Sequence, residues 1–188
     1  MVARIIITAL ILLFVSCPIS AKEIAGVAID EQISQSDGTT LHFNGAGIRS
    51  KFVFKVYLAM LYLENPNKDR QAMISDSGSK QLIMHFLYKK VGKDDLVEAW
   101  NEGFNNNGSP NQLETLKSEI EQFNKMFDTV KAGDRVVLDY IPEKGTVVSI
   151  RGEQKGTIAG KPFNDLMLSI WLGDKPVGEK LHANLLGN

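Results

Sequence analysis

The segment from Phe52 to Leu63 constrains the fold of this chain more than any other, because its side chains alternate with a period of two. The even-numbered residues, Phe52 to Tyr62, are all apolar or aromatic. The odd-numbered residues, Val53 to Leu63, are mostly apolar as well. A strand with two apolar faces must be covered on both sides. The segment therefore predicts a strand in the interior of a sheet.

Similar segments before and after it predict further strands. The chain contains an apolar stretch at Ile24–Ile33, a turn at Ser36–Thr40 and a strand that begins at Leu41–Phe43. Gln81–Tyr88 has the same character as Phe52–Leu63. Three short strands are expected later, joined by hairpin turns: Arg135–Ile141, Thr146–Arg151 and Gly156–Ala159.

Helical spacing separates these two groups of strands. Leu96, Trp100 and Phe104 predict one helix, and Ser109-Pro110 begins another, whose apolar stripe runs from Leu113 to Phe127. Two more helices are expected near the C-terminus, at Phe163–Leu172 and just before Gly187. No repeat or linker divides the chain. We expect one α+β domain over residues 22–188, built on a mainly antiparallel sheet.

The first twenty-one residues predict a secretory signal peptide. Arg4 precedes the apolar stretch Ile5–Val15, and Ile19-Ser20-Ala21 is a plausible cleavage site. Eleven residues at about 1.5 Å each do not span a hydrocarbon layer of about 30 Å. We therefore expect a secreted, periplasmic protein that meets a membrane only through this segment if it stays uncleaved. Retention as an anchor and lipidation at Cys17 are the alternatives.

Composition excludes several classes of function. The formal net charge is -1 and no basic block stands out, so no nucleic-acid partner is expected. Cys17 is the single cysteine, so cleavage after Ala21 leaves no thiol for a disulfide or a thiolate metal site. The three histidines lack ligand spacing, and no phosphate loop or hydrolase motif is present. We expect neither a metal nor a cofactor.

Arg49 and Tyr57 are the remaining candidates for chemistry. A guanidinium can bind a carboxylate or a phenolate through paired donors, and Tyr57 can offer a hydroxyl from the surface of the sheet. The alternative is that Arg49 is a solvated turn residue and Tyr57 a packed aromatic. The residues alone leave both interpretations open.

Four motifs together resemble the chalcone isomerase-like family, in particular its bacterial, secreted branch. They are GAGIR, which ends at Arg49, the strand ending VYLAMLYLE, Trp100-Asn101 in a helix, and IWLGDKPV near the C-terminus. The resemblance covers residues 23–188. It implies an open-faced β-sandwich, in which a large antiparallel sheet is covered on one face by helices. The family includes plant isomerases that close a chalcone ring and non-catalytic members that bind fatty acids.

The resemblance assigns roles position by position. Arg49 matches the family arginine, and Tyr57 occupies the threonine position of the enzymes, as in the fatty-acid-binding members. Asn101 matches the family asparagine, but Asp94 stands where the enzymes have tyrosine, and the last polar position falls near Asn164 or Ser169. Arg49, Tyr57 and Asn101 are therefore the expected ligand-binding residues, and no catalytic set is complete.

Geometry sets a condition on this site. In one straight strand, eight steps of about 3.4 Å would separate Arg49 from Tyr57 by about 27 Å. A shared site requires a turn between them, and Gly45 and Gly47 favour one at Arg49–Lys51.

The sequence supports binding of a fatty acid or a similar small amphipathic carboxylate, without catalysis. One alternative is an intramolecular lyase acting on a chalcone-like enone. The other is a structural or partner-binding periplasmic protein. The identity of the ligand and the oligomeric state do not follow from the sequence.

Overall fold

The predicted strands pair into one seven-stranded sheet in which every neighbouring pair is antiparallel. The structure is a computed structural model and describes residues 22–187. The signal peptide and the lipidation site at Cys17 predicted from the sequence lie outside the described residues. The spatial order is β11-β10-β9-β6-β5-β4-β3. The strands are β3 (Gln32–Ser34), β4 (Thr40–Lys51), β5 (Phe54–Leu63), β6 (Lys80–Phe86), β9 (Arg135–Ile141), β10 (Gly145–Ile150) and β11 (Glu153–Ile158).

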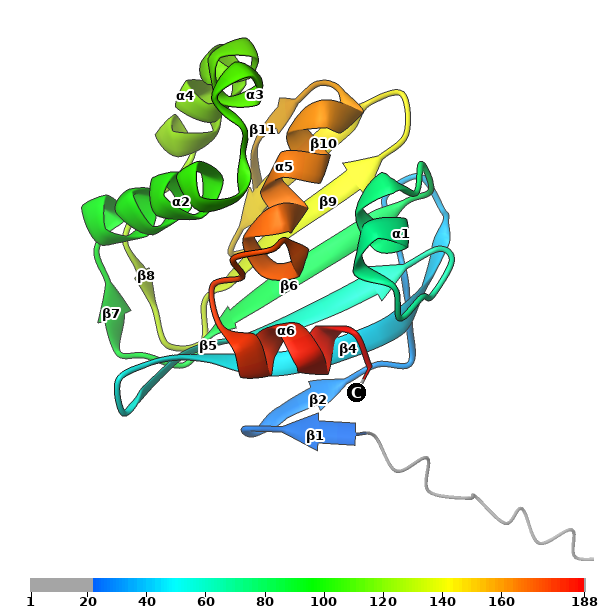
Figure 1. Cartoon of the computed structure of the whole chain (residues 1–188). Helices are drawn as coiled ribbons and strands as arrows, with labels where there is room; N and C mark the ends of the chain where they lie inside the picture. Colours follow the sequence, from blue (N-terminus) through cyan, green and yellow to red (C-terminus); the bar gives the residue numbers. More distant parts are fainter. Residues whose placement is uncertain (1–21, 188) are drawn as a thin grey trace, which may run out of the picture.

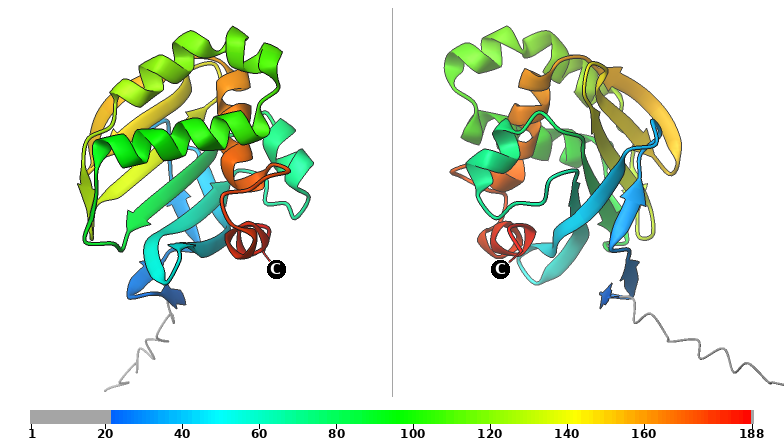
Figure 2. Two further views of the ribbon diagram at one scale, coloured as in Figure 1. Left: turned by 60° about the vertical axis from the view of Figure 1, so that its left-hand side comes forward. Right: turned by 90° about the vertical axis from the view of Figure 1, so that its right-hand side faces the viewer.

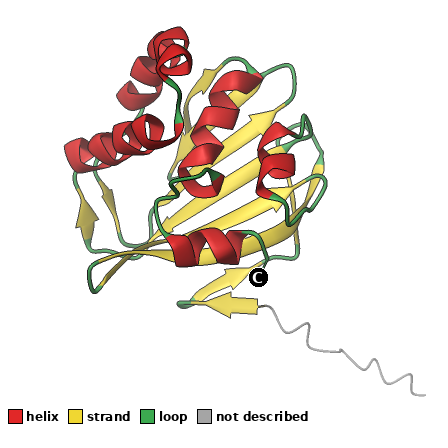
Figure 3. Cartoon of the chain, in the orientation of Figure 1, coloured by secondary structure: helices red, strands yellow, loops and turns green. Residues whose placement is uncertain are grey.

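The helices lie on one face of this sheet, as Figures 1 and 3 show. Viewed along the sheet in Figure 2, they form a second layer that leaves the other face to the N-terminal strands. The result is the expected α+β open-faced sandwich. The helices are α1 (Arg70–Ser75), α2 (Lys93–Asn107), α3 (Pro110–Thr115), α4 (Lys117–Lys125), α5 (Lys161–Leu172) and α6 (Glu179–Leu185).

Two apolar clusters confirm the alternation of β5. Tyr57, Ala59 and Leu61 pack under the helices with Trp100, Phe123 and Trp171. Leu58, Met60 and Tyr62 pack on the opposite face. A short hairpin covers this opposite face through Val27 and Ile29. It consists of β1 (Lys22–Ile24) and β2 (Val27–Ile29).

The single strand expected at Ile24–Ile33 is wrong, because the segment folds into three short strands. The backbone has positive φ at Ala25 (53°) and Gly26 (81°), which reverses the chain between β1 and β2. Only β3 then joins the main sheet. After this reversal, Val27 and Ile29 of β2 pack on the face of the sheet opposite the helices.

The single helix expected from Ser109 to Phe127 is interrupted at Leu116, where φ is -99° and ψ is 14°. α3 ends there and α4 begins, while the Leu116 side chain stays buried. Three short elements are absent from the sequence prediction: α1, β7 (Lys90–Val91) and β8 (Val130–Lys131). β7 and β8 pair with each other and connect the α2–α4 segment to the sheet.

None of the helices among residues 22–187 is both long and apolar enough to cross a membrane.

Candidate functional site

Arg49 and Tyr57 are directly opposite each other on neighbouring strands. β4 and β5 form a hairpin, and its register pairs Arg49 with Tyr57. Residues opposite each other in an antiparallel pair have Cβ atoms about 4.5–5.5 Å apart and point to the same face. The 27 Å separation of a straight strand therefore does not occur. The turn that prevents it lies at Phe52–Val53, so the strand expected at Phe52–Leu63 begins only at Phe54. The expected turn at Arg49–Lys51 is wrong.

Gly45 and Gly47 serve the packing of α6 and do not form a turn. A Cβ on Gly45 would stand 2.3 Å from the carbonyl oxygen of Asn184, and one on Gly47 would stand 2.9 Å from Cβ of Asn184. Both distances are too short for real contacts. The C-terminal helix therefore lies directly on the backbone of β4. Arg49, two residues beyond Gly47, follows on the same helix-covered face.

The Tyr57 hydroxyl is held in place by Trp171 of α5. The indole Nε1–H of Trp171 donates to Tyr57 Oη at 3.0 Å, and both side chains are buried. Burial raises the pKa of Tyr57 to about 12, although the hydrogen bond from Trp171 and the charge of Arg49 act in the opposite direction. The phenol thus stays protonated at neutral pH. Since its oxygen already accepts from Trp171, its own O–H can donate to a ligand.

The half-buried Arg49 side chain has no carboxylate partner within 4.0 Å among the residues that the structure describes. Within these residues, its one hydrogen bond runs from Nη1 to the carbonyl oxygen of Ser50. A guanidinium carries five N–H donors, so most of them remain available. Within residues 22–187, Arg49 is therefore a cation without a carboxylate partner, and its charge acts on the phenol of Tyr57.

These two side chains line a cavity of about 560 Å³ between the sheet and α2. Pockets of about 300–1,000 Å³ with apolar walls and a few polar groups are typical small-molecule sites. The sheet contributes Val56, Met84 and Phe86 to the walls, and α2 contributes Leu96 and Trp100. Further walls come from the hairpin tip, from β7, and from the loop after α5: Phe52, Phe54, Lys90, Val91, Lys175, Pro176 and Val177.

Trp100 lines the same cavity and carries a buried, unpaired donor. Its side chain is 3% exposed, and its Nε1–H has no hydrogen-bond partner within the described part of the chain. An unpaired buried donor costs about 1–3 kcal/mol. A polar ligand atom or a water molecule in the cavity would remove that penalty if it reached the indole N–H.

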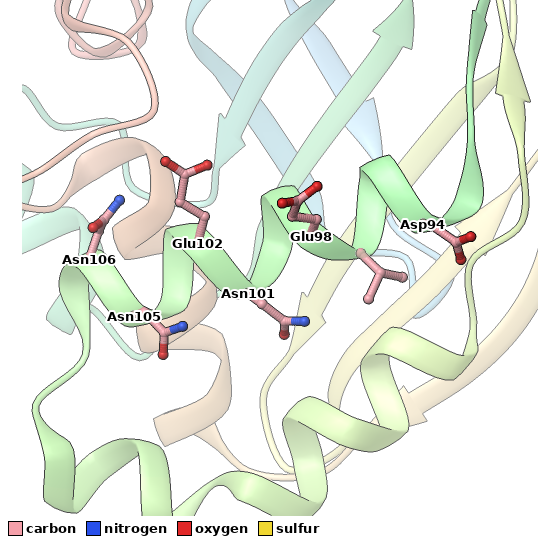
Figure 4. A pocket seen from close by; sticks show the side chains of 7 residues that line it. Asp94, Glu98, Asn101, Glu102, Asn105 and Asn106 are labelled. Atoms are coloured by element: carbon pink, nitrogen blue, oxygen red, sulfur yellow. The ribbon is translucent and has the colours of Figure 1, made fainter.

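The structure does not bring Asn101 to Arg49 and Tyr57. Asn101 projects from α2 on a different side, in a shallow surface depression that Asp94 and Asn105 share (Figure 4). Its Oδ1 accepts a hydrogen bond of 2.8 Å from Asn124 Nδ2 of α4. Asn101 therefore joins two helices. Of the three expected site residues, only Arg49 and Tyr57 share a cavity.

The last polar position considered from the sequence does not reach the cavity either. Asn164 is buried on α5 and donates from Nδ2 to Oγ1 of Thr146 at 3.3 Å. The Ser169 hydroxyl donates to the carbonyl oxygen of Leu166 at 2.6 Å.

Trp171 and Trp100 are the site residues that the sequence analysis missed. Both lie on apolar helical stripes, where an indole is indistinguishable from ordinary core. Only the facing hydroxyl of Tyr57 gives the N–H of Trp171 a role. No group of three or more metal-ligating side chains was found among residues 22–187.

Comparisons with known proteins agree with this fold. The model of a family described as chalcone isomerase-like matches residues 21–187. No curated protein matches the sequence. Among solved structures, the chain is similar to the crystal structure of a fatty-acid binding protein from Arabidopsis thaliana, with a TM-score of 0.61 and 14% sequence identity. The similarity covers 83% of this chain and 96% of that chain. At this identity it shows a shared fold.

Proposed function

The chain belongs to the chalcone isomerase-like family, and we propose that it binds a long-chain fatty acid, or a similar amphipathic carboxylate, without converting it. The observation that carries the proposal is the pairing of Arg49 with Tyr57 at an apolar cavity. The carboxylate would lie between the guanidinium and the tyrosine hydroxyl. The alkyl chain would lie along Met84, Phe86 and Leu96.

The chemistry of the two polar groups suits a carboxylate. Arg49 supplies a positive charge and several donors, and Tyr57 supplies an O–H that stays protonated up to high pH. Neither group needs a conformational change of the backbone, because the β4–β5 register already holds them side by side. A preorganised site binds more tightly since less ordering free energy is lost on binding.

The name of one structural neighbour supports the same class of ligand. That plant protein is named as a fatty-acid binding protein. Because the two sequences are only 14% identical, the main support for this class of ligand is the cavity of this chain. The neighbour's name is consistent with it.

Binding is favoured over isomerisation because of where Asn101 lies. The lyase alternative uses Asn101 to order a water next to Arg49, whereas Oδ1 of Asn101 accepts from Asn124 on another side of α2. We propose that the protein acts outside the cytoplasm. Support for that location comes only from the sequence of residues 1–21.

Native mass spectrometry with lipid extraction tests the proposal. The protein is purified from its own cells without detergent, as wild type and as Arg49→Ala. A co-purifying fatty acid that is lost in Arg49→Ala would support binding. A wild-type protein that is empty and takes up no added palmitate would contradict it, and would favour a structural or partner-binding role.

A further inference from the structure

The tip of the β4–β5 hairpin exposes three large apolar side chains in a row. Phe52 is 90% exposed, Val53 87% and Phe54 53%, and they are the exposed large apolar side chains found in residues 22–187. The hairpin projects from the lower left of the sheet in Figure 1. Adjacent exposed apolar side chains would gain free energy by leaving water, and such clusters mark interaction sites. A partner for them is therefore expected.

Backbone geometry holds these side chains in the exposed position. Phe52 has φ of 56°, in the left-handed region that bulky side chains rarely adopt. Phe54 packs edge-on against Tyr88, with ring centroids 5.5 Å apart. The tip is thus an ordered element of the fold.

Lysines flank the apolar tip on both sides. Lys51 and Lys55 enclose it in the sequence KFVFK, and both are exposed. Two more exposed lysines, Lys89 and Lys90, directly follow the Tyr88 that contacts Phe54. An apolar element surrounded by basic side chains is complementary to an anionic lipid surface.

The size of the tip distinguishes a membrane from a protein partner. A stable protein interface uses about 20–30 residues on each side. Three apolar side chains on a projecting hairpin are too few for that. They suffice for shallow insertion into lipid, where each buried apolar side chain adds favourable transfer free energy.

The tip also forms part of the cavity. Lys51, Phe52 and Phe54 line the same cavity as Arg49 and Tyr57. Its charged lining consists of four basic side chains, Arg49, Lys51, Lys90 and Lys175, and two acidic ones, Asp95 and Glu102. Three of the basic residues lie on the hairpin and β7 and the fourth in the loop after α5, whereas both acidic residues lie on α2.

We propose that the β4–β5 hairpin tip docks on an anionic lipid bilayer, so that the cavity opens next to the membrane surface. The ligand then passes between the bilayer and the cavity beside Phe52 and Phe54. The transfer step rests on the proposed fatty-acid binding, whereas the docking step is independent of it.

A fluorescent probe at the tip tests the docking step. A nitrobenzoxadiazole label is attached at Val53→Cys in a Cys17→Ser background, and vesicles of phosphatidylcholine with or without phosphatidylglycerol are added. The control is the same label at Ser36→Cys, an exposed position in the turn at the other end of β4, roughly 40 Å away. We expect a blue shift at position 53 with anionic vesicles, and none at position 36.

Matched charge variants test the role of the lysines. Lys55→Gln should reduce partitioning into anionic vesicles about fivefold, since one basic residue near such a surface contributes roughly that factor. Lys117→Gln, the same charge change on α4, should leave it unchanged. All variants are prepared identically, so that residues 1–21 are the same in each.

Each remaining outcome overturns the proposal. No blue shift at position 53 contradicts docking. An equal shift on neutral vesicles contradicts the anionic surface. A shift that needs no vesicle and grows with protein concentration assigns the tip to contacts between copies of this chain.

Palmitate binding in vesicle-free solution separates this inference from the proposed function. Val53 and Lys55 do not line the cavity. Val53→Ser with Lys55→Gln should therefore keep palmitate binding and lose vesicle binding. If the wild type itself does not bind palmitate but still binds vesicles, the proposed function is contradicted and docking stands.

Discussion

Arg49 and Tyr57 are register partners across β4 and β5, although eight positions separate them in the sequence. This pairing joins a cation that has no carboxylate partner among residues 22–187 to a hydroxyl whose oxygen already accepts a hydrogen bond from Trp171.

Arg49→Ala should weaken palmitate binding about 10- to 100-fold, because a hydrogen bond to a charged group contributes about 1.5–3 kcal/mol. Methyl palmitate, which has no carboxylate, should lose far less. Isothermal titration calorimetry measures both. Arg135→Ala is the matched control. Arg135 is the register partner of His85, and His85 is the register partner of Leu58, so Arg135 lies on the face of the sheet opposite the cavity. Equal losses in the two variants would contradict a specific role of Arg49.

Tyr57→Phe should weaken palmitate binding about tenfold and also lower the stability of the protein. The first effect comes from the lost O–H donor. The second comes from the N–H of Trp171, which would be left buried and unpaired at about 1–3 kcal/mol. Urea denaturation and calorimetry report the two effects separately. Unchanged stability would show that the Trp171 hydrogen bond contributes little.

Ionisation of tyrosine should destabilise the protein at high pH. Burial raises the pKa of Tyr57 and of Tyr62 to about 12, from about 10 in the unfolded chain. Because the folded pKa is the higher one, stability is fully present below pH 10 and is lost as pH rises from about 10 to 12. Denaturation at several pH values measures this loss. The loss of stability should be smaller in Tyr57→Phe. Since Tyr57 stays protonated between pH 7 and 9, palmitate affinity should not change through Tyr57 over that range.

Gly45→Ala should destabilise the protein, by about 1–3 kcal/mol if the backbone can adjust and by more if it cannot. The added Cβ would meet the carbonyl oxygens of Asn184 and Leu185 in α6. Thermal unfolding measures the effect. Gly178→Ala is the control, because a Cβ there has its nearest contact at 3.8 Å. Similar melting temperatures for both variants would contradict the close approach of α6 to β4.

Much of the fold could be predicted from the sequence because the controlling signals are local. The alternation in β5, the helical stripe of α2 and the Ser109-Pro110 start of α3 depend on neighbouring residues, and the structure confirms them. The break at Leu116 has no glycine or proline to mark it, and the Leu116 side chain is buried there, so this break depends on packing against the rest of the molecule. The short helix α1 does have a local start signal, the N-cap Asp69, which the sequence analysis did not use.

The site was harder to predict, because it depends on register. A turn shifted from Arg49–Lys51 to Phe52–Val53 decides whether Arg49 faces Tyr57. The glycines before Arg49 indicated a turn, but their observed role is contact with α6, an element more than 130 residues later in the chain. The role of Asn101 was also hard to predict, because its hydrogen-bond partner Asn124 is in another helix.

The most direct test of the central claim is a ¹³C NMR spectrum of carboxyl-labelled palmitate added to the protein in the absence of vesicles. The account predicts one bound carboxyl resonance, which changes its chemical shift in Tyr57→Phe and disappears in Arg49→Ala. A bound resonance that is the same in the wild type and in Arg49→Ala would contradict the account, since it would place the carboxylate away from Arg49.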